Sequence, residues 1–124
     1  MYNDDGVRAE RTGQRCPKIS ERHRHWGFNC PAVDIDFLMV EYDHGRPVAI
    51  VEYKEINWNP SNTSNMTYKA IRELAGELPF LVAVYDPNDW VFIVYPMNDA
   101  AERQYGDWAK IRISEKDFVE SLYA

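Results

Sequence analysis

Residues 34–55 read Asp-Ile-Asp-Phe-Leu-Met-Val-Glu-Tyr-Asp-His-Gly-Arg-Pro-Val-Ala-Ile-Val-Glu-Tyr-Lys-Glu, and this stretch decides the fold. Two apolar-rich segments flank an Asp-His-Gly-Arg-Pro turn, which predicts a β-hairpin with strands over about 34–42 and 47–54. Apolar side chains fall on both faces of each strand. We therefore expect both strands to occupy central, covered positions in a sheet.

Charged residues gather at the ends of these two strands. Side chains two positions apart on a strand share a face, so Asp34 and Asp36 project together, and so do Glu52 and Lys54. An apolar hairpin gains nothing from three carboxylates and a lysine at neighbouring ends unless they bind something. The simplest candidate is a divalent metal ion.

The register of the hairpin decides whether these groups meet. If residues 42 and 47 pair, Asp36 lies opposite Tyr53, and both aspartates face away from Glu52 and Lys54. A β-bulge or an altered turn would bring them to one face. A shared metal site therefore requires an irregularity between Asp36 and Glu52.

The rest of the chain predicts an α/β sandwich in which helices flank a mixed sheet. The expected elements are a helix over 17–25, the hairpin, a helix over about 64–77, strands over Phe80–Tyr85 and Trp90–Tyr95, a short helix from near Asn98, and a C-terminal helix capped by Ser114.

The composition predicts one domain. A length of 124 residues suits a single domain with a modest core, and we expect residues 1–15 to form a flexible basic arm. There is no apolar run of about 18 residues, and two cysteines give no disulfide framework, so we expect a cytoplasmic protein with no membrane partner. The net charge of −6 weakens the case for a nucleic-acid partner, although residues 1–25 carry six basic against four acidic side chains.

The hairpin resembles the signature of a known enzyme superfamily. Asp36 followed by apolar residues, and then Glu52-Tyr53-Lys54, resembles the PD-(D/E)XK nuclease motif, with the leading proline absent. The wider phrase beginning at Trp26 is similar to small uncharacterised proteins of phages and mobile elements. The resemblance implies a restriction-endonuclease-like core of order αβββαβ. It covers the hairpin by motif and the following helix and strand by order alone.

The resemblance also implies an activity. It would make the protein a metal-dependent nuclease that hydrolyses phosphodiester bonds, in DNA rather than RNA, with Asp36, Glu52 and Lys54 as catalytic residues. Mg²⁺, or Mn²⁺ in its place, would be held by Asp36, Glu52, the carbonyl of Tyr53 and Asp34, either aspartate being a candidate for the principal ligand. Lys54 would assist the attacking water or stabilise negative charge on phosphorus. Because so small a domain holds few substrate contacts, a homodimer or a partner protein is expected.

Two other interpretations of the hairpin stay open. The first is a catalytically inactive module of the same fold that binds nucleic acid or protein. The second is a solvated hairpin edge with a cross-strand salt bridge.

Two further groups of residues are candidates for contact with nucleic acid. These are Arg22, His23, Arg24 and His25 near the N-terminus, and Tyr68, Lys69 and Arg72 on the helix after the motif. Ordinary solvated surface is the alternative for both groups. It is also the alternative for Glu10 and Glu21, which otherwise are candidates for an additional metal ligand.

A zinc site is a third possibility for the N-terminal segment. Cys16, His23, His25 and Cys30 offer four ligands within 15 residues, although structural zinc sites usually have tighter cysteine spacing. This pattern would correspond to a small zinc-stabilised binding protein.

Overall fold

The computed structural model describes residues 17–26, 35–60 and 66–122, without the side chains at positions 20, 23, 24 and 26. The chain divides into two units, Met1–Val33 and Asp34–Ala124. In the first unit the described element is the helix α1, Pro17–Trp26, which confirms the helix predicted there. Pro17 occupies its first position, where the missing amide hydrogen costs no helical hydrogen bond.

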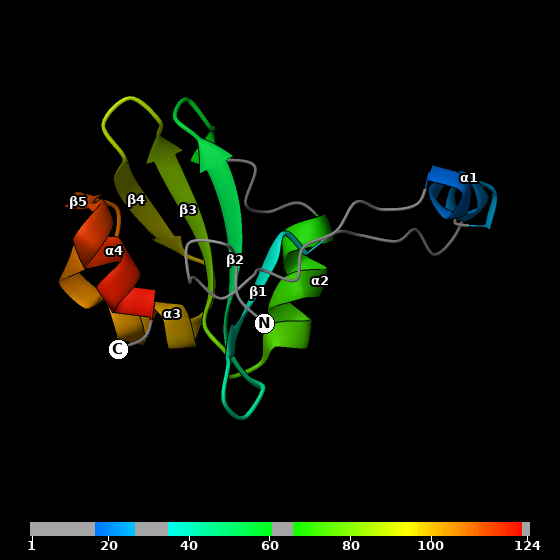
Figure 1. The fold of residues 1–124 in the computed structure, drawn as a ribbon, viewed down its shortest axis with the longest axis horizontal. Coiled ribbons are helices and arrows are strands. Elements are labelled where there is room, and N and C mark those ends of the chain that lie inside the picture. The colour runs from blue at the N-terminus through cyan, green and yellow to red at the C-terminus, as the bar shows by residue number, and fades with distance from the viewer. Residues whose placement is uncertain (1–16, 27–34, 61–65, 123–124) are drawn as a thin grey trace, which may run out of the picture. The chain divides into compact units, whose positions relative to one another are not determined.

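The second unit is a five-stranded mixed sheet flanked by helices (Figure 1). Its elements are β1 (Phe37–Glu41), β2 (Arg46–Glu55), α2 (Met66–Ala75), β3 (Phe80–Asp86), β4 (Val91–Pro96), α3 (Asp99–Tyr105), the 3₁₀ turn η2 (Gly106–Trp108), β5 (Arg112–Ser114) and α4 (Glu115–Leu122). The strands lie in the order β1-β2-β3-β4-β5. Only β2 and β3 are parallel, joined by a crossover through α2, and the other neighbours are antiparallel.

The predicted α/β class is confirmed, and the order of elements follows the prediction with two additions, the 3₁₀ turn η2 and the strand β5. The short strand β5 was not predicted, because Arg112–Ser114 is too short to show a strand pattern. Among the described residues two strands precede α2, whereas the core implied by the resemblance has three.

One expectation about the hairpin is wrong. β2 lies inside the sheet, and its residues Ala49–Glu52 are buried. β1, by contrast, is an edge strand of the described sheet, and its residues Leu38 and Val40 are 51% and 45% exposed. Both strands carry apolar residues on both faces, but this pattern corresponds to a covered strand only in β2. In β1 it belongs to a partly exposed edge strand.

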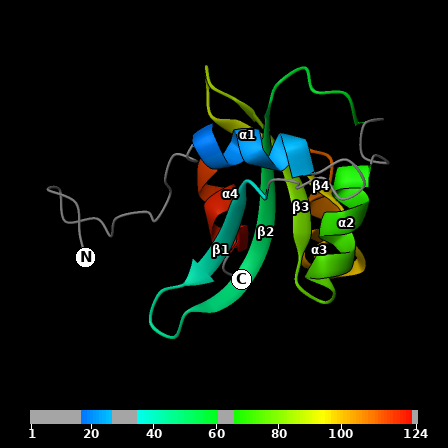
Figure 2. The ribbon, with the colours of Figure 1, turned by 90° about the vertical axis from the view of Figure 1, so that its right-hand side faces the viewer.

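Each face of the sheet carries its own apolar core. Successive side chains of a strand point to opposite faces of the sheet. One core joins α3 and α4 to Val51, Leu81 and Val94, and the other joins α2 to Ile50 and Val82. Figures 1 and 2 show α2 on one side of the sheet and α3 with α4 on the other. The face that carries α2 is the one on which the candidate site lies.

Asn98 joins three of these elements. Its side-chain oxygen accepts hydrogen bonds from the backbone N–H groups of Phe80 (3.1 Å) and Ala101 (3.0 Å), and its amide donates to the carbonyl of Leu78 (2.8 Å). The Ala101 bond is the N-cap of α3, a helix that the sequence predicted to begin near Asn98. Asn98 thereby fixes the end of the α2 crossover against the start of β3 and α3.

Candidate metal site

A register shift in the hairpin brings the two acidic positions level. Near the turn, Glu41 pairs with Arg46 and Val40 with Pro47, so the assumed pairing of 42 with 47 is wrong. An irregularity between Met39 and Val40 then changes the register, and Phe37 pairs with Val51. One residue further on, Asp36 lies level with Glu52, so the condition for a shared face is met.

Hydrogen bonds hold Asp36 and Glu52 together across the strand ends. The backbone N–H of Asp36 donates to Oε1 of Glu52 at 3.2 Å. The backbone N–H of Tyr53 donates to Oδ2 of Asp36 at 3.3 Å. Each carboxylate is therefore fixed by the backbone of the opposite strand, which positions both groups independently of any ligand.

Glu52 is a buried acid in an apolar face, with 6% of its surface exposed. Burial raises the pKa of Glu52 above its ordinary value of 4.5, and the neighbouring charge of Asp36 raises it further. The hydrogen bond from the Asp36 backbone and the charge of Lys54 act in the opposite direction. A buried carboxylate beside a second carboxylate is costly unless a cation shares the site.

The backbone of Tyr53 contributes a third oxygen to the same edge. In an extended strand the N–H and C=O of one residue point to the same neighbour, so the carbonyl of Tyr53 points to the side on which its N–H meets Asp36. The Tyr53 ring packs on the opposite face, in edge contact with Phe37 at 5.1 Å between ring centroids. This placement leaves the Asp36–Glu52 face to the carboxylates.

Lys54 lies on the same face as Glu52, because the two residues are two positions apart on β2. The positive charge of Lys54 lowers the pKa of Glu52, and among the described residues Lys54 has no ion-pair partner within 4 Å.

Tyr68 comes from the first turn of α2 and is buried against the same face. Burial, followed by the charges of Glu52 and Asp36, raises the pKa of the Tyr68 hydroxyl. The structure thus brings Asp36, Glu52, Lys54 and Tyr68 together.

The other residues of α2 take different positions. Lys69 is exposed, as expected of a residue available to a partner. Arg72 is half-buried, and its Nε donates to the carbonyl of Met97 at 2.6 Å. Arg72 therefore lies beside a different part of the sheet from the carboxylates.

The remaining candidates are in the first unit or outside the described residues. Arg22, Glu21 and His25 are exposed on α1, and His23 and Arg24 belong to α1 without described side chains. Glu10, Cys16, Cys30 and Asp34 lie outside the described residues. The zinc hypothesis and the role of Asp34 stay predictions.

Within the described residues, no three His, Cys, Asp or Glu side chains gather in a way that could hold a metal ion. Within these residues the Asp36–Glu52 pair offers two carboxylates, and Mg²⁺ is usually bound through one or two. None of the helices in this part of the chain is long and apolar enough to cross a membrane.

Comparison of the chain with protein-family models, with curated proteins and with solved structures gives no match.

Sequence reasoning found the carboxylates but missed how they are held. The bond from the Asp36 amide to Glu52 depends on the irregularity, which skips Val48 between Pro47 and Ala49. Pro47 was the local signal, because proline within an interior strand is found at bulges. The burial of Tyr68 against this face was signalled only by its place on the apolar stripe of α2, shared with Ile71.

Proposed function

We propose that this protein is a metal-dependent phosphodiesterase of nuclease type that acts on DNA. The observation that carries the proposal is the Asp36–Glu52 pair, in which two carboxylates are fixed side by side by backbone hydrogen bonds with Lys54 on the same face. The resemblance of these residues to the PD-(D/E)XK motif supplies the reaction class.

The donor set fits a hard divalent cation. Asp36, Glu52 and the carbonyl of Tyr53 offer oxygen only, which suits Mg²⁺ or Mn²⁺, and Asp34 is a further candidate ligand. A divalent cation would also offset the cost of burying Glu52 beside Asp36. When bound, Mg²⁺ supplies Lewis acidity and lowers the pKa of bound water.

Lys54 has a separate role. Its ammonium group, on the face of the carboxylates, would hold the attacking water or stabilise the negative charge that develops on the phosphate. The partly buried position of Lys54 makes its charge more effective than that of a fully solvated lysine.

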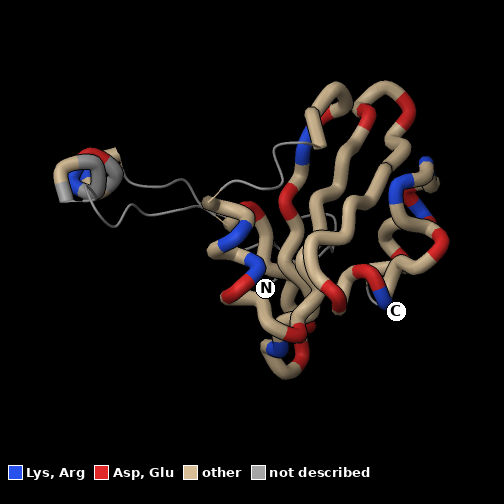
Figure 3. Tube along the Cα trace, turned by 180° about the vertical axis from the view of Figure 1, so that it is seen from behind, with Lys and Arg blue, Asp and Glu red and all other residues tan. Residues whose placement is uncertain are grey.

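The charge distribution limits how DNA can be bound. Residues 34–124 carry eight Lys and Arg against sixteen Asp and Glu, and acidic positions are spread along the trace in Figure 3. Contact with DNA must therefore rely on local basic groups, for which Lys69 on α2 and Arg22 and His25 on α1 are the exposed candidates. A homodimer or a partner protein would supply further contacts.

The test is cleavage of linear, supercoiled, branched and single-stranded DNA with Mg²⁺ or Mn²⁺, and with EDTA. Glu52→Gln keeps the shape of the side chain and its acceptor oxygen, and Glu55→Gln is the matched control because Glu55 is exposed on the same strand. We expect cleavage by the native chain and by Glu55→Gln only. Cleavage that survives Glu52→Gln would contradict the assignment, and metal binding without cleavage of any substrate would favour the inactive binding module.

A further inference from the structure

The two edges of the described sheet differ in how they are protected against pairing with another chain (Figure 2). At one edge, β5 has three residues, of which Arg112 and Ser114 are exposed, and α4 follows it directly. Short, charged edge strands resist the addition of a further strand. At the other edge, β1 is longer, and its exposed side chains, Leu38 and Val40, are apolar. The extra residue of the hairpin irregularity, Val48, belongs to β2, so β1 itself is regular and suited to pairing.

The backbone groups of Leu38 and Val40 point away from the sheet. The carbonyl of Glu41 accepts a hydrogen bond from the N–H of Gly45 at 3.0 Å, on the hairpin side of β1. Backbone groups alternate in direction along a strand, so those of Met39 also face β2, and those of Leu38 and Val40 face outward. Among the strands that the structure describes, β1 pairs with β2 alone. The outward N–H and C=O groups of both residues are therefore available to a further strand.

A second copy of β1 matches these groups. In an antiparallel pair centred on Met39, Leu38 of each copy lies opposite Val40 of the other, and the two residues exchange N–H···O=C hydrogen bonds in both directions. Leu38 and Val40 project to one face of the strand, because they are two positions apart. Their half-exposed side chains therefore form one contiguous apolar cluster across the pair.

The charges of the strand permit the same register. Glu41 lies opposite Phe37 of the second copy, and Asp36 lies opposite Tyr42 of the second copy. Like charges directly opposite one another destabilise a strand pair, and this register sets each of these carboxylates against an uncharged side chain. The strand is thus its own complement in hydrogen bonds, apolar side chains and charge.

We propose that this protein forms a two-fold dimer in which β1 pairs antiparallel with β1 of a second copy, centred on Met39. The two five-stranded sheets then form one continuous sheet. The two-fold axis is perpendicular to this sheet, so both Asp36–Glu52 pairs lie on the same face. Because position 36 lies opposite position 42, the two Asp36 residues are offset by about 20 Å along the strands. This contact does not depend on the phosphodiesterase assignment.

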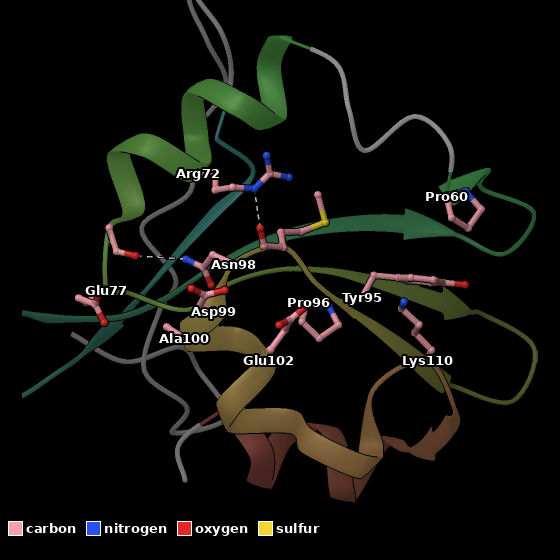
Figure 4. Close-up of a pocket in the computed structure, with 12 residues that line it drawn as sticks. Pro60, Arg72, Glu77, Tyr95, Pro96, Asn98, Asp99, Ala100, Glu102 and Lys110 are labelled. Carbon is pink, nitrogen blue, oxygen red and sulfur yellow. Dashed lines mark hydrogen bonds between the residues drawn. The ribbon is translucent and has the colours of Figure 1, made fainter.

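The pairing uses a small contact and leaves the main depression of the second unit open. That depression, of about 680 Å³, lies between α2 and the start of α3 (Figure 4), and the residues that line it all come from position 60 onward. The contact consists of one strand of five residues from each copy. Because stable interfaces usually bury at least about 1,200 Å², we expect a weak dimer with a micromolar dissociation constant.

The test is sedimentation equilibrium of the full chain from about 1 to 500 μM, where a monomer–dimer equilibrium is expected. Val40→Glu adds a carboxylate to the paired face and should weaken dimerisation about tenfold or more. Val119→Glu is the matched control and should dimerise normally, because Val119 on α4 is 46% exposed, against 45% for Val40. Glu52→Gln should also dimerise normally, which separates this result from the test of the metal site.

Cysteine substitutions test the register, in a chain whose Cys16 and Cys30 are replaced by serine. Met39→Cys should form a disulfide between copies, because the two positions 39 make a non-hydrogen-bonded pair with Cα atoms about 4.5 Å apart. Leu38→Cys should not, because the two positions 38 lie diagonally, about 7–8 Å apart. A monomer at every concentration, equal dimerisation by folded Val40→Glu, or cross-linking at position 38 and not at 39 would overturn the proposal.

Discussion

The backbone N–H of Asp36 donates a hydrogen bond to the carboxylate of Glu52, 3.2 Å away, although 16 residues separate them in sequence. The bond joins the start of an edge strand to the middle of an interior strand. It places two acidic side chains on the face that α2 covers.

The first prediction concerns the pH dependence of stability without metal. Because burial raises the pKa of Glu52 above 4.5, the folded chain binds a proton more tightly than the unfolded chain. The free energy of unfolding should therefore fall as the pH rises from 4.5 through the raised pKa. Glu52→Gln should lack this contribution and be more stable than the native chain near neutral pH, as measured by urea denaturation in EDTA. Parallel stability curves for the two chains would show that Glu52 does not titrate abnormally.

The second prediction concerns Lys54. If its ammonium stabilises charge developing on the phosphate, Lys54→Ala should lower the rate of DNA cleavage by about 100-fold to 1,000-fold at saturating Mg²⁺. Lys69→Ala, which removes an exposed lysine of α2, should change the cleavage rate much less and act mainly on the affinity for DNA. Single-turnover cleavage rates separate these effects. Equal losses of rate in both variants would remove Lys54 from the catalytic assignment.

The third prediction concerns Asn98. Replacement by alanine removes the N-cap of α3 and leaves the N–H of Phe80 and the carbonyl of Leu78 without their partner. The free energy of unfolding should fall by about 2–3 kcal/mol. Asn88→Ala, in the exposed turn between β3 and β4, should cost no more than about 0.5 kcal/mol. Guanidinium denaturation of both variants measures the difference, which should vanish if the Asn98 network does not form in solution.

The fourth prediction contrasts two leucines of the sheet. Leu81 is fully buried in β3, and Leu81→Ala should destabilise the fold by about 2–5 kcal/mol. Leu38 is half exposed on β1, and Leu38→Ala should cost less than about 1 kcal/mol. A cost for Leu38→Ala as large as that for Leu81→Ala would mean that β1 is covered in solution, as its sequence pattern had suggested.

The predictable part of the fold comes from local chemistry. The apolar runs of β2 and β3, the capping residue Asn98 and the capping bond from Asp117 N–H to Ser114 Oγ at 3.1 Å all follow rules that involve neighbouring residues. The edge position of β1 depends on what lies beside it, which no local pattern encodes.

The candidate site was predictable in its residue types but not in its geometry. Strand periodicity grouped Asp34 with Asp36 and Glu52 with Lys54, and the resemblance to the nuclease motif favoured Asp36. A regular hairpin, however, would place the aspartates on the face opposite Glu52 and Lys54. Pro47 lies at the irregularity and is a residue type found at bulges, but it does not show by itself which register follows.

The central claim is that Asp36 and Glu52 bind a divalent cation, and calorimetric titration of Mn²⁺ into the metal-free chain tests it most directly. The account predicts one ion bound per chain, with the same affinity in Glu55→Gln and no detectable binding in folded Glu52→Gln. Binding should also weaken below the raised pKa of Glu52, because the proton and the metal compete for the same carboxylate. Equal Mn²⁺ binding by the native chain and by Glu52→Gln, or no binding by either, would contradict the account.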